Sequence, residues 1–351
     1  MGLAVARSAL SVLSTDDARW LPFLASQPEA TVFHHPAWSD LLEEAYGHRT
    51  QLLVETSGDD IIAGMPLTEI QGAFSERRFV SVPFTDHCPP IATTPSTLAQ
   101  LTLDLLDWKE AVGVRQLTVH GALSPTPGVH LATRAVHHQL SLGDSRRVFE
   151  SLSGPVRSAI RKAEKQGVEA CISRSPADLG TFYKLHTQTR RRLGLPVQPR
   201  RFFEAMWKHV VVPGLGFVVL AYCSGQPIAA GLYLAWNKNL IYKFGASDDR
   251  YWGLRPNNLV MWTAIDWACR QGYRQLDFGR TEVDNHGLRE FKRRWGSIEL
   301  PLIYSSIGPV SSASIPRAPM WAVGKVIRSS PAIVCRAVGE LVYGRMLGSV
   351  A

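Results

Sequence analysis

The fold class of this chain follows from residues 216–247, GFVVLAYCSGQPIAAGLYLAWNKNLIYKFGAS. Three apolar runs of strand length, 216–223, 228–236 and 240–247, are separated by the short turns SGQP and NKN. Strand-length runs of β-branched and aromatic residues divided by such turns predict consecutive strands joined by hairpins. The stretch therefore predicts an antiparallel three-stranded meander.

A helix and a fourth strand are predicted directly after the meander. In PNNLVMWTAIDWACRQG, residues 256–272, only Thr263, Asp266 and Arg270 form a polar stripe, so the helix should be largely buried. The strand LDFG, residues 276–279, follows it. We expect this strand to splay from the third strand of the meander, which would expose backbone N–H groups.

The first half of the chain repeats the same order more faintly. Helical segments precede three strands, a helix and a further strand in both halves, which predicts two mixed α/β domains of one type. We place domain 1 at residues 1–145 and domain 2 at 146–316, with helices in 317–351 that pack back on domain 1 or rest on a membrane surface. The repeated elements are strands 50–55, 61–70 and 77–84, helix 97–113 and strand 115–120.

Composition agrees with an ordinary globular protein of about two domains. The chain has 351 residues, of which 45% are hydrophobic and 19% charged, so it has apolar material for packed cores and no signature of disorder. The 38 Lys and Arg against 30 Asp and Glu give a net charge of +8, which suits nucleic acid, nucleotides or an acidic membrane surface. Charge alone selects none of these partners.

The cysteines and the apolar runs indicate in which cellular compartment the protein is expected. Five widely separated cysteines with no C-x-x-C pair favour a reduced, cytoplasmic setting. The start, MGLAVARSALSVLS, lacks the pattern of a signal peptide, and Pro213, Gly214 and Gly216 break the most apolar later run, so we expect no transmembrane helix.

A cationic stripe is predicted on the helix of SGPVRSAIRKAEKQG, residues 153–167. Ser153 is a candidate N-cap, and Arg157, Arg161 and Lys165 then follow one another at a spacing of four. Like charges at this spacing repel by a few tenths of a kcal/mol per pair. A phosphate would offset the repulsion, whereas the alternative is a solubilising face.

The loop YWGLRPNNLV, residues 251–260, precedes the buried helix. Free backbone N–H groups at a helix start, with Arg255, Asn257 and Asn258 beside them, can bind a phosphate. A routine helix start with no ligand is the alternative.

A second cluster of cations lies in LDFGRTEVDNHGLREFKRRWG, residues 276–296. Helical spacing leaves Arg289 and Lys292 away from an apolar side, so an anion could bind to them, or the segment could be a solvated helix end. The apolar side consists of Leu288, Phe291 and Trp295.

We further predict that Arg280 and Lys292 reach one cavity. Gly279 frees the strand end, and the apolar side of the helix holds Lys292 in place. The alternative is that Arg280 pairs with Glu282 or Asp284 and Lys292 points into solvent.

Several other chemistries lose support. No G-x-S-x-G, P-loop or H-E-x-x-H motif occurs, which argues against a hydrolase or an NTPase. The adjacent pairs His34–His35 and His137–His138 would point to opposite faces of a strand or diverge on a helix, so we expect no metal site.

Taken together, these motifs resemble the FemABX-type acyltransferases, tandem-domain relatives of the GNAT N-acyltransferase fold. The resemblance spans nearly the whole chain and implies two tandem GNAT-like domains with mixed, mostly antiparallel sheets. The branch described as BioF2-like acetyltransferase domains is the most similar. The motifs are FHHPAWSDLLEEAYG (33–47), VSVPFTDHCPP (80–90), VRSAIRKAEKQGV (156–168), FGASDDRYWGLRPNNLVMWTAIDWACRQGYRQLDFGRT (244–281) and GLREFKRRWG (287–296).

The resemblance also implies roles for particular residues. Lys292 matches a catalytically important cation near the donor carbonyl, and Arg157 and Arg161 lie in a helix that the family uses near the phosphates of a nucleotide-linked acceptor. Asp277 could orient the attacking amine, although a strand-end Asp also caps or pairs structurally.

We therefore expect an amide-forming transferase that moves an acyl or aminoacyl group from aminoacyl-tRNA or acyl-CoA to a small amine-bearing acceptor. The best-known members of the family extend peptidoglycan precursors, so cell-envelope, peptide or polysaccharide metabolism is the expected setting. We expect Lys292 and Asp277 to be catalytic, and Arg157, Arg161, Arg255, Asn257, Asn258, Arg280 and Arg289 to bind substrate or phosphate. A cytoplasmic monomer with no metal and no permanently bound cofactor is expected. The alternative is a non-catalytic module that binds a nucleotide or RNA.

Overall fold

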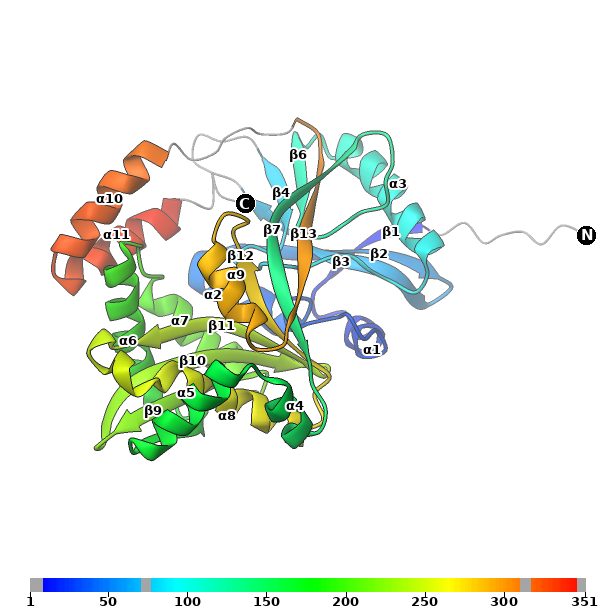
Figure 1. Cartoon of the computed structure of the whole chain (residues 1–351). Helices are drawn as coiled ribbons and strands as arrows, with labels where there is room; N and C mark the ends of the chain where they lie inside the picture. Colours follow the sequence, from blue (N-terminus) through cyan, green and yellow to red (C-terminus); the bar gives the residue numbers. More distant parts are fainter. Residues whose placement is uncertain (1–8, 71–76, 310–316, 346–351) are drawn as a thin grey trace, which may run out of the picture. The chain divides into compact units, whose positions relative to one another are not determined.

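The computed structural model describes residues 9–70, 77–309 and 317–345 (Figure 1). These residues fall into two compact units. Unit 1 takes in the chain up to Arg134 and a return segment that starts at Leu302, and unit 2 takes in Ala135–Pro301 and the helices after residue 316. Strand β7 (Val129–Ser141), which we did not predict, contains the first division. The chain therefore changes unit within a strand and not near residue 145, where we expected a boundary.

Unit 1 is built on a mixed sheet. Its elements are β1 (Ala9–Ser14), α1 (Trp20–Ala25), α2 (Pro36–Tyr46), β2 (Thr50–Ser57), β3 (Asp60–Ile70), β4 (Arg78–Ser81), β5 (Ile91–Ala92), α3 (Pro95–Ala111), β6 (Gln116–Val119) and the end of β13 (Ile298–Ile307). The sheet order is β1-β2-β3-β4-β6-β13, with β5 on β3, and only β4 and β6 pair in parallel. The predicted strand-strand-strand-helix-strand order of the first half is confirmed.

Unit 2 repeats this plan around the predicted meander, which is confirmed. Its elements are the rest of β7, α4 (Ser145–Ser151), α5 (Gly154–Lys165), β8 (Val168–Ser173), α6 (Asp178–Leu193), α7 (Arg200–Met206), the π-helix η1 (Trp207–Val211), β9 (Gly216–Cys223), β10 (Gln226–Trp236), β11 (Asn239–Ser247), the 3-10 helix η2 (Asp249–Leu254), α8 (Pro256–Arg270), β12 (Gln275–Thr281), α9 (His286–Arg293), the start of β13, α10 (Arg317–Ser329) and α11 (Ala332–Arg345). The sheet order is β7-β12-β11-β10-β9-β8, and only β11 and β12 pair in parallel.

Two-residue turns set the register of the meander. Ser224 and Gly225 have φ of 50° and 75°, and Asn237 and Lys238 have φ of 48° and 61°. Consecutive positive φ angles are the mark of type I′ turns, whose twist matches that of the strands they join. The three strands β9, β10 and β11 consequently run side by side (Figure 1).

Helices cover both faces of the unit 2 sheet. Tyr233 of β10 packs in the core beneath α8, in contact with Val260. Phe244 of β11 instead packs against His186 of α6 and Phe203 of α7. The buried side of α8 follows the predicted pattern, because its polar residues lie away from the core residues Leu259, Val260, Met261, Ala264, Ile265 and Ala268.

The C-terminal helices α10 and α11 belong to unit 2 and contact α6. Cys335 is buried with its thiol near the carbonyl of Leu195, and Arg190 at the end of α6 donates to the hydroxyl of Tyr343 at 3.2 Å. Our expectation that these helices pack on the N-terminal domain is therefore corrected, because they contact α6 and the residues that follow it in unit 2. In the part of the chain that the structure describes, none of the helices combines the length and apolar character needed to cross a membrane.

Candidate active site

The sheet of unit 2 opens where β11 and β12 separate. The two strands pair only at three positions, from Asn239 with Gln275 to Ile241 with Asp277. One extra residue of β11, Lys243, forms a β-bulge against β10, and a bulge bends its strand. The predicted splay of these strands is thus confirmed, and we call the opening beyond Ile241 and Asp277 the fork.

Backbone groups of β11 face into the fork. The N–H of Asp248 donates to the carbonyl of Ile228 at 2.9 Å. In an antiparallel pair, alternate residues bond to the neighbouring strand, so the N–H and C=O groups of Gly245 and Ser247 point away from β10. At Ser247 these groups are bonded to α6: the N–H donates to Thr189 Oγ1 at 2.9 Å, and the carbonyl accepts from Arg192 at 2.9 Å. Gly245 lies where pairing with β12 has already ended, so its N–H and C=O groups, which we call its polar edge, are directed into the fork.

Gly245 also permits close packing beside this edge. A Cβ at this position would collide with the hydroxyl of Tyr242, which lies directly over the glycine. Burial raises the pKa of Tyr242 to about 12, so the phenol is neutral.

Asp277 stands at the root of the fork and binds within the protein. Its Oδ2 lies 2.7 Å from Nδ1 of His137 on β7, and its Oδ1 accepts the N–H of Gly279 at 2.7 Å. The structure therefore pairs the predicted catalytic carboxylate with a histidine that sequence reasoning had set aside. The adjacent His138 faces the other way, toward Glu299, as predicted for consecutive strand residues.

Lys292 lies behind the free end of β12. Its side chain is only 3% exposed, and its ammonium donates to the carbonyls of Gly279 at 2.7 Å and Arg280 at 3.3 Å. The alternative in which Lys292 points into solvent is therefore wrong. The guanidinium of Arg280, however, pairs with Glu282 at 3.0 Å, as the first part of that same alternative predicted.

Arg289 is held in an ion pair beside this lysine. It donates to both carboxylate oxygens of Glu299, at 2.8 and 2.7 Å, and to the carbonyl of Val283 at 2.8 Å. The pair with Arg289 holds the pKa of Glu299 below its usual range. Burial, together with the nearby Lys292 ammonium, lowers the pKa of His138. The structure thus places Arg289 in an ion pair that sequence reasoning did not foresee, and its role as a phosphate ligand stays a prediction.

The turn between β11 and α8 contains the predicted phosphate-binding residues Arg255, Asn257 and Asn258. Arg255 caps α8 in the left-handed conformation, with φ of 61°, and makes no side-chain capping bond. Trp252 and Asn257 both donate to the hydroxyl of Ser247, at 2.9 and 3.3 Å. Arg192 of α6, which we did not predict, stacks over Trp252 with its guanidinium carbon 4.6 Å from the ring centroid.

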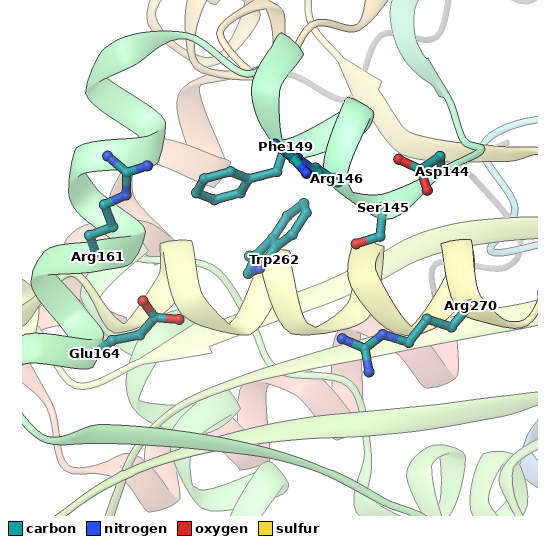
Figure 2. Close-up of a pocket in the computed structure, with 8 residues that line it drawn as sticks. All are labelled: Asp144, Ser145, Arg146, Phe149, Arg161, Glu164, Trp262 and Arg270. Atoms are coloured by element: carbon teal, nitrogen blue, oxygen red, sulfur yellow. The ribbon is translucent and has the colours of Figure 1, made fainter.

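An open groove of about 510 Å³ lies between α4, α5 and α8 (Figure 2). The guanidinium of Arg161 lies 5.6 Å from the ring centroid of Phe149, which meets Trp262 edge-on at 4.8 Å. Arg157 does not line the groove and donates to the carbonyl of Glu150 instead. The lining residues are Asp144, Ser145, Arg146, Phe149, Arg161, Glu164, Trp262 and Arg270.

Most of the predicted residues lie in three places within unit 2, which are the fork with the end of β12, the turn before α8, and the groove; Arg157 and Arg289 lie outside these places. His137, Arg192 and Trp262 were missed, because their contacts join segments far apart in the sequence. Within residues 9–70, 77–309 and 317–345, no cluster of three His, Cys, Asp or Glu residues suits a metal ion.

Comparisons with known proteins agree with this architecture. Residues 153–293, from the N-cap of α5 to the end of α9, match the family model described as an acetyltransferase (GNAT) domain. No curated protein sequence matches the chain.

Three solved structures share the fold over most of the chain. FemX superposes with a TM-score of 0.70 at 12% identity, covering 89% of this chain and 99% of FemX. L-PGS from Bacillus licheniformis gives 0.55 at 11% identity, with 91% and 99% covered. A tandem GNAT protein from the clavulanic acid biosynthesis pathway gives 0.54 at 13% identity, with 87% and 100% covered. Residues 153–293 thus match an acetyltransferase (GNAT) domain, and the chain shares the tandem GNAT-like fold of these solved structures.

Proposed function

We propose that the protein transfers an acyl or aminoacyl group to the amine of a small acceptor and that the reaction takes place at the fork between β11 and β12. The observation that carries this proposal is the end of pairing at Ile241 and Asp277, which leaves the polar edge of Gly245 directed into the opening. A fixed backbone N–H in such a position can stabilise the oxyanion that forms when an amine attacks a carbonyl.

The chemistry requires positioning more than a nucleophilic side chain. An amine attacks an activated ester or thioester directly, so the protein must align the two groups and stabilise the developing charge. Lys292 supports both tasks. Its ammonium holds the carbonyls of Gly279 and Arg280, which fixes the end of β12, and its positive charge adds to the field at the fork.

The donor's phosphate would lie at the start of α8. The N-terminus of this helix has no side-chain cap, and Arg255, Asn257 and Asn258 surround it. Oriented N–H groups and the helix dipole favour an anion there. The stack of Arg192 on Trp252 places a further cation beside the same turn.

We propose aminoacyl-tRNA as the donor over acyl-CoA. A net charge of +8 favours the binding of a large polyanion. The groove beside Arg161 combines guanidinium groups with two aromatic rings, a combination that binds single-stranded nucleic acid. The acceptor would be a small amine of cell-envelope, peptide or polysaccharide metabolism, and we propose a cytoplasmic monomer, with membrane contact through its C-terminal helices as a further option.

The test is to offer the purified protein a mixture of charged tRNA and, separately, acetyl-CoA, each with simple amines as acceptors. We expect amide formation from charged tRNA, with binding that weakens steeply as salt is raised. Transfer from acetyl-CoA but not from charged tRNA would show that the donor is acyl-CoA and not aminoacyl-tRNA. Binding without transfer from either donor would leave the non-catalytic module as the function of this fold.

A further inference from the structure

We propose that Arg192, at the end of α6, binds a phosphate of the acyl donor and that the C-terminal helices α10 and α11 hold this arginine in position. The inference rests on the proposed transferase function and deepens it, because it names a ligand for the donor and gives the C-terminal helices a role. The family match ends at residue 293 and therefore does not include α10 and α11. All of these elements belong to unit 2.

The guanidinium of Arg192 is fixed by its protein contacts. Its Nη1 donates to the carbonyl of Ser247 at 2.9 Å, and its central carbon lies over the ring of Trp252, 4.6 Å from the centroid. The same Nη1 is 3.9 Å from a carboxylate oxygen of Asp249, at the limit of an ion pair. A guanidinium that is already stacked and hydrogen-bonded loses little conformational freedom when it binds a ligand.

The other edge of this guanidinium, formed by Nε and Nη2, makes no hydrogen bond within the part of the chain that the structure describes. In Arg289 the same two atoms bind both carboxylate oxygens of Glu299, at 2.8 and 2.7 Å. In Arg250 they bind the carboxylate of Asp248. The side chain of Arg192 is 26% exposed, so it reaches solvent, and its Nε–Nη2 edge suits an anion with two neighbouring oxygens.

The position of Arg192 favours a phosphate of the donor. Ser247, which accepts its hydrogen bond, follows Gly245 by two residues on β11, about 7 Å along a strand. Arg192 therefore lies near the fork, and both candidate donors have a phosphate linked to the reacting carbonyl, through a ribose in aminoacyl-tRNA and through the pantetheine arm in acyl-CoA. Arg255 donates its N–H to the carbonyl of Trp252 at 3.0 Å, and within the described residues its side chain makes no hydrogen bond or ion pair.

The acidic residues of this turn do not cancel its positive charge. The carboxylate of Asp248 is bound by Arg250, which lowers the pKa of Asp248, and Asp249 is 55% exposed. Together with Arg192, residues 248–255 contain three arginines and two aspartates, a net charge of +1. The local charge therefore favours an anion at the Nε–Nη2 edge.

The two arginines that precede Arg192 bind the C-terminal helices, which lie against α6 (Figure 1). Arg190 donates to the hydroxyl of Tyr343 on α11 at 3.2 Å, and Nε of Arg191 donates to the carbonyl of Ser330, between α10 and α11. Successive residues of an α-helix are about 100° apart around its axis. The last turn of α6 is thus held from one side by α10 and α11 and presents Arg192 to β11 on another.

Close backbone contacts keep this junction from shifting. A Cβ at Gly194, directly after α6, would lie 2.8 Å from the carbonyl oxygen of Gly324 on α10. A Cβ at Gly339 on α11 would lie 1.9 Å from the carbonyl oxygen of Val197. Since backbone meets backbone at both places, a movement of α10 or α11 would move the end of α6 and, with it, Arg192.

The experiment measures the binding of uncharged tRNA and of CoA, and the rates of transfer from charged tRNA and acetyl-CoA. We expect Arg192→Gln to raise Kd and KM for the donor that the wild-type chain uses by about 10- to 100-fold and to leave kcat unchanged. Phosphate-free counterparts, 3′-O-aminoacyl-adenosine for tRNA and S-acetyl-pantetheine for acetyl-CoA, should react equally well with variant and wild type. The donor whose binding is lost identifies the source of the phosphate.

Arg174→Gln is the matched control. It removes another guanidinium that stacks on a tryptophan, 5.7 Å from the ring centroid of Trp267, which lies 11 residues after the start of α8. This variant should leave Kd, KM and kcat unchanged. Wild-type affinity in Arg192→Gln, or an equal loss with the phosphate-free counterparts, would overturn the assignment of Arg192.

Arg191→Gln tests the positioning role of the C-terminal helices. It should weaken donor binding by about threefold or more, and the double variant with Arg192→Gln should bind no more weakly than Arg192→Gln alone. If Arg191→Gln does not fold, Tyr343→Phe, which removes the acceptor of Arg190, takes its place. Additive losses in the double variant would overturn the positioning role. A wild-type chain that binds a donor without transfer would overturn the proposed function alone, and one that binds neither tRNA nor CoA would overturn both.

Discussion

Replacing Lys292 with methionine tests how the free end of β12 is held. Methionine has a similar length and fills the same volume, so the substitution removes the ammonium without opening a cavity. Two carbonyls lose their donor: that of Gly279, bonded at 2.7 Å in a buried site, and that of Arg280, bonded at 3.3 Å. The substitution thus removes one buried charge and these two hydrogen bonds.

The expected cost follows from these contacts. A hydrogen bond from a charged donor contributes about 1.5–3 kcal/mol, and a buried carbonyl without a donor costs about 1–3 kcal/mol. The removal of a buried ammonium offsets part of this loss, because the charge no longer has to be desolvated. We therefore expect the free energy of unfolding to fall by about 2 kcal/mol. If the ammonium also supports the oxyanion, kcat should fall by about 100-fold or more.

Urea unfolding measures the free energy of unfolding, and hydrogen–deuterium exchange measures how firmly the end of β12 is held; both are independent of turnover. Exchange should rise in a peptide that covers Gln275–Thr281 and stay unchanged in the strands β9 and β10. Lys292→Arg keeps the charge but not the geometry of a point donor, so it should rescue little of the turnover. Wild-type stability, exchange and turnover in Lys292→Met would refute both roles of this lysine.

Three further predictions concern other parts of the chain. Burial raises the pKa of Glu55 from 4.5 to about 8. The contribution of Glu55 to the free energy of unfolding should therefore be fully present below pH 4.5 and fall by up to about 1.4 kcal/mol per pH unit as the pH rises toward 8. Denaturant titrations at several pH values should show that Glu55→Gln removes this dependence on pH. Gly245→Ala should collide with the hydroxyl of Tyr242 and cost about 1–3 kcal/mol in thermal unfolding, and Tyr242→Phe in the same chain should recover part of the loss, whereas additive costs would refute the contact. Arg161→Gln should weaken tRNA binding and reduce the salt slope by about 1, measured by filter binding; Arg19→Gln, a surface residue of unit 1, should not, and equal slopes would exclude the groove as a phosphate site.

The order of elements in each unit could be predicted from local patterns. The hairpins of 216–247 follow from short turns between apolar runs, and positive φ angles at Ser224–Gly225 and Asn237–Lys238 agree with type I′ turns. The burial of α8 follows from its narrow polar stripe. These features depend on residues close in sequence, so the periodicity of side chains is sufficient to predict them.

The candidate site could be predicted only in part. The clustering of Arg255 and Asn257 at the start of α8 follows from their position in one turn. Lys292 lies behind the end of β12, but its carbonyl partners were not foreseen, and its catalytic role stays a prediction. The ion pair of Arg289 with Glu299 was not foreseen either, because the sequence does not show that Glu299 comes back to meet Arg289.

The sequence by itself therefore determined the meander, the buried helix, the tandem plan and the cationic segments, because each of these is encoded within a run of neighbouring residues. Only the tertiary structure decided which of those side chains face one another. His137 and Asp277 are 140 residues apart and meet because β7 and β12 pair with a one-residue bulge at Gly279. A shift of one residue in that register would turn every side chain of the strand to the other face of the sheet.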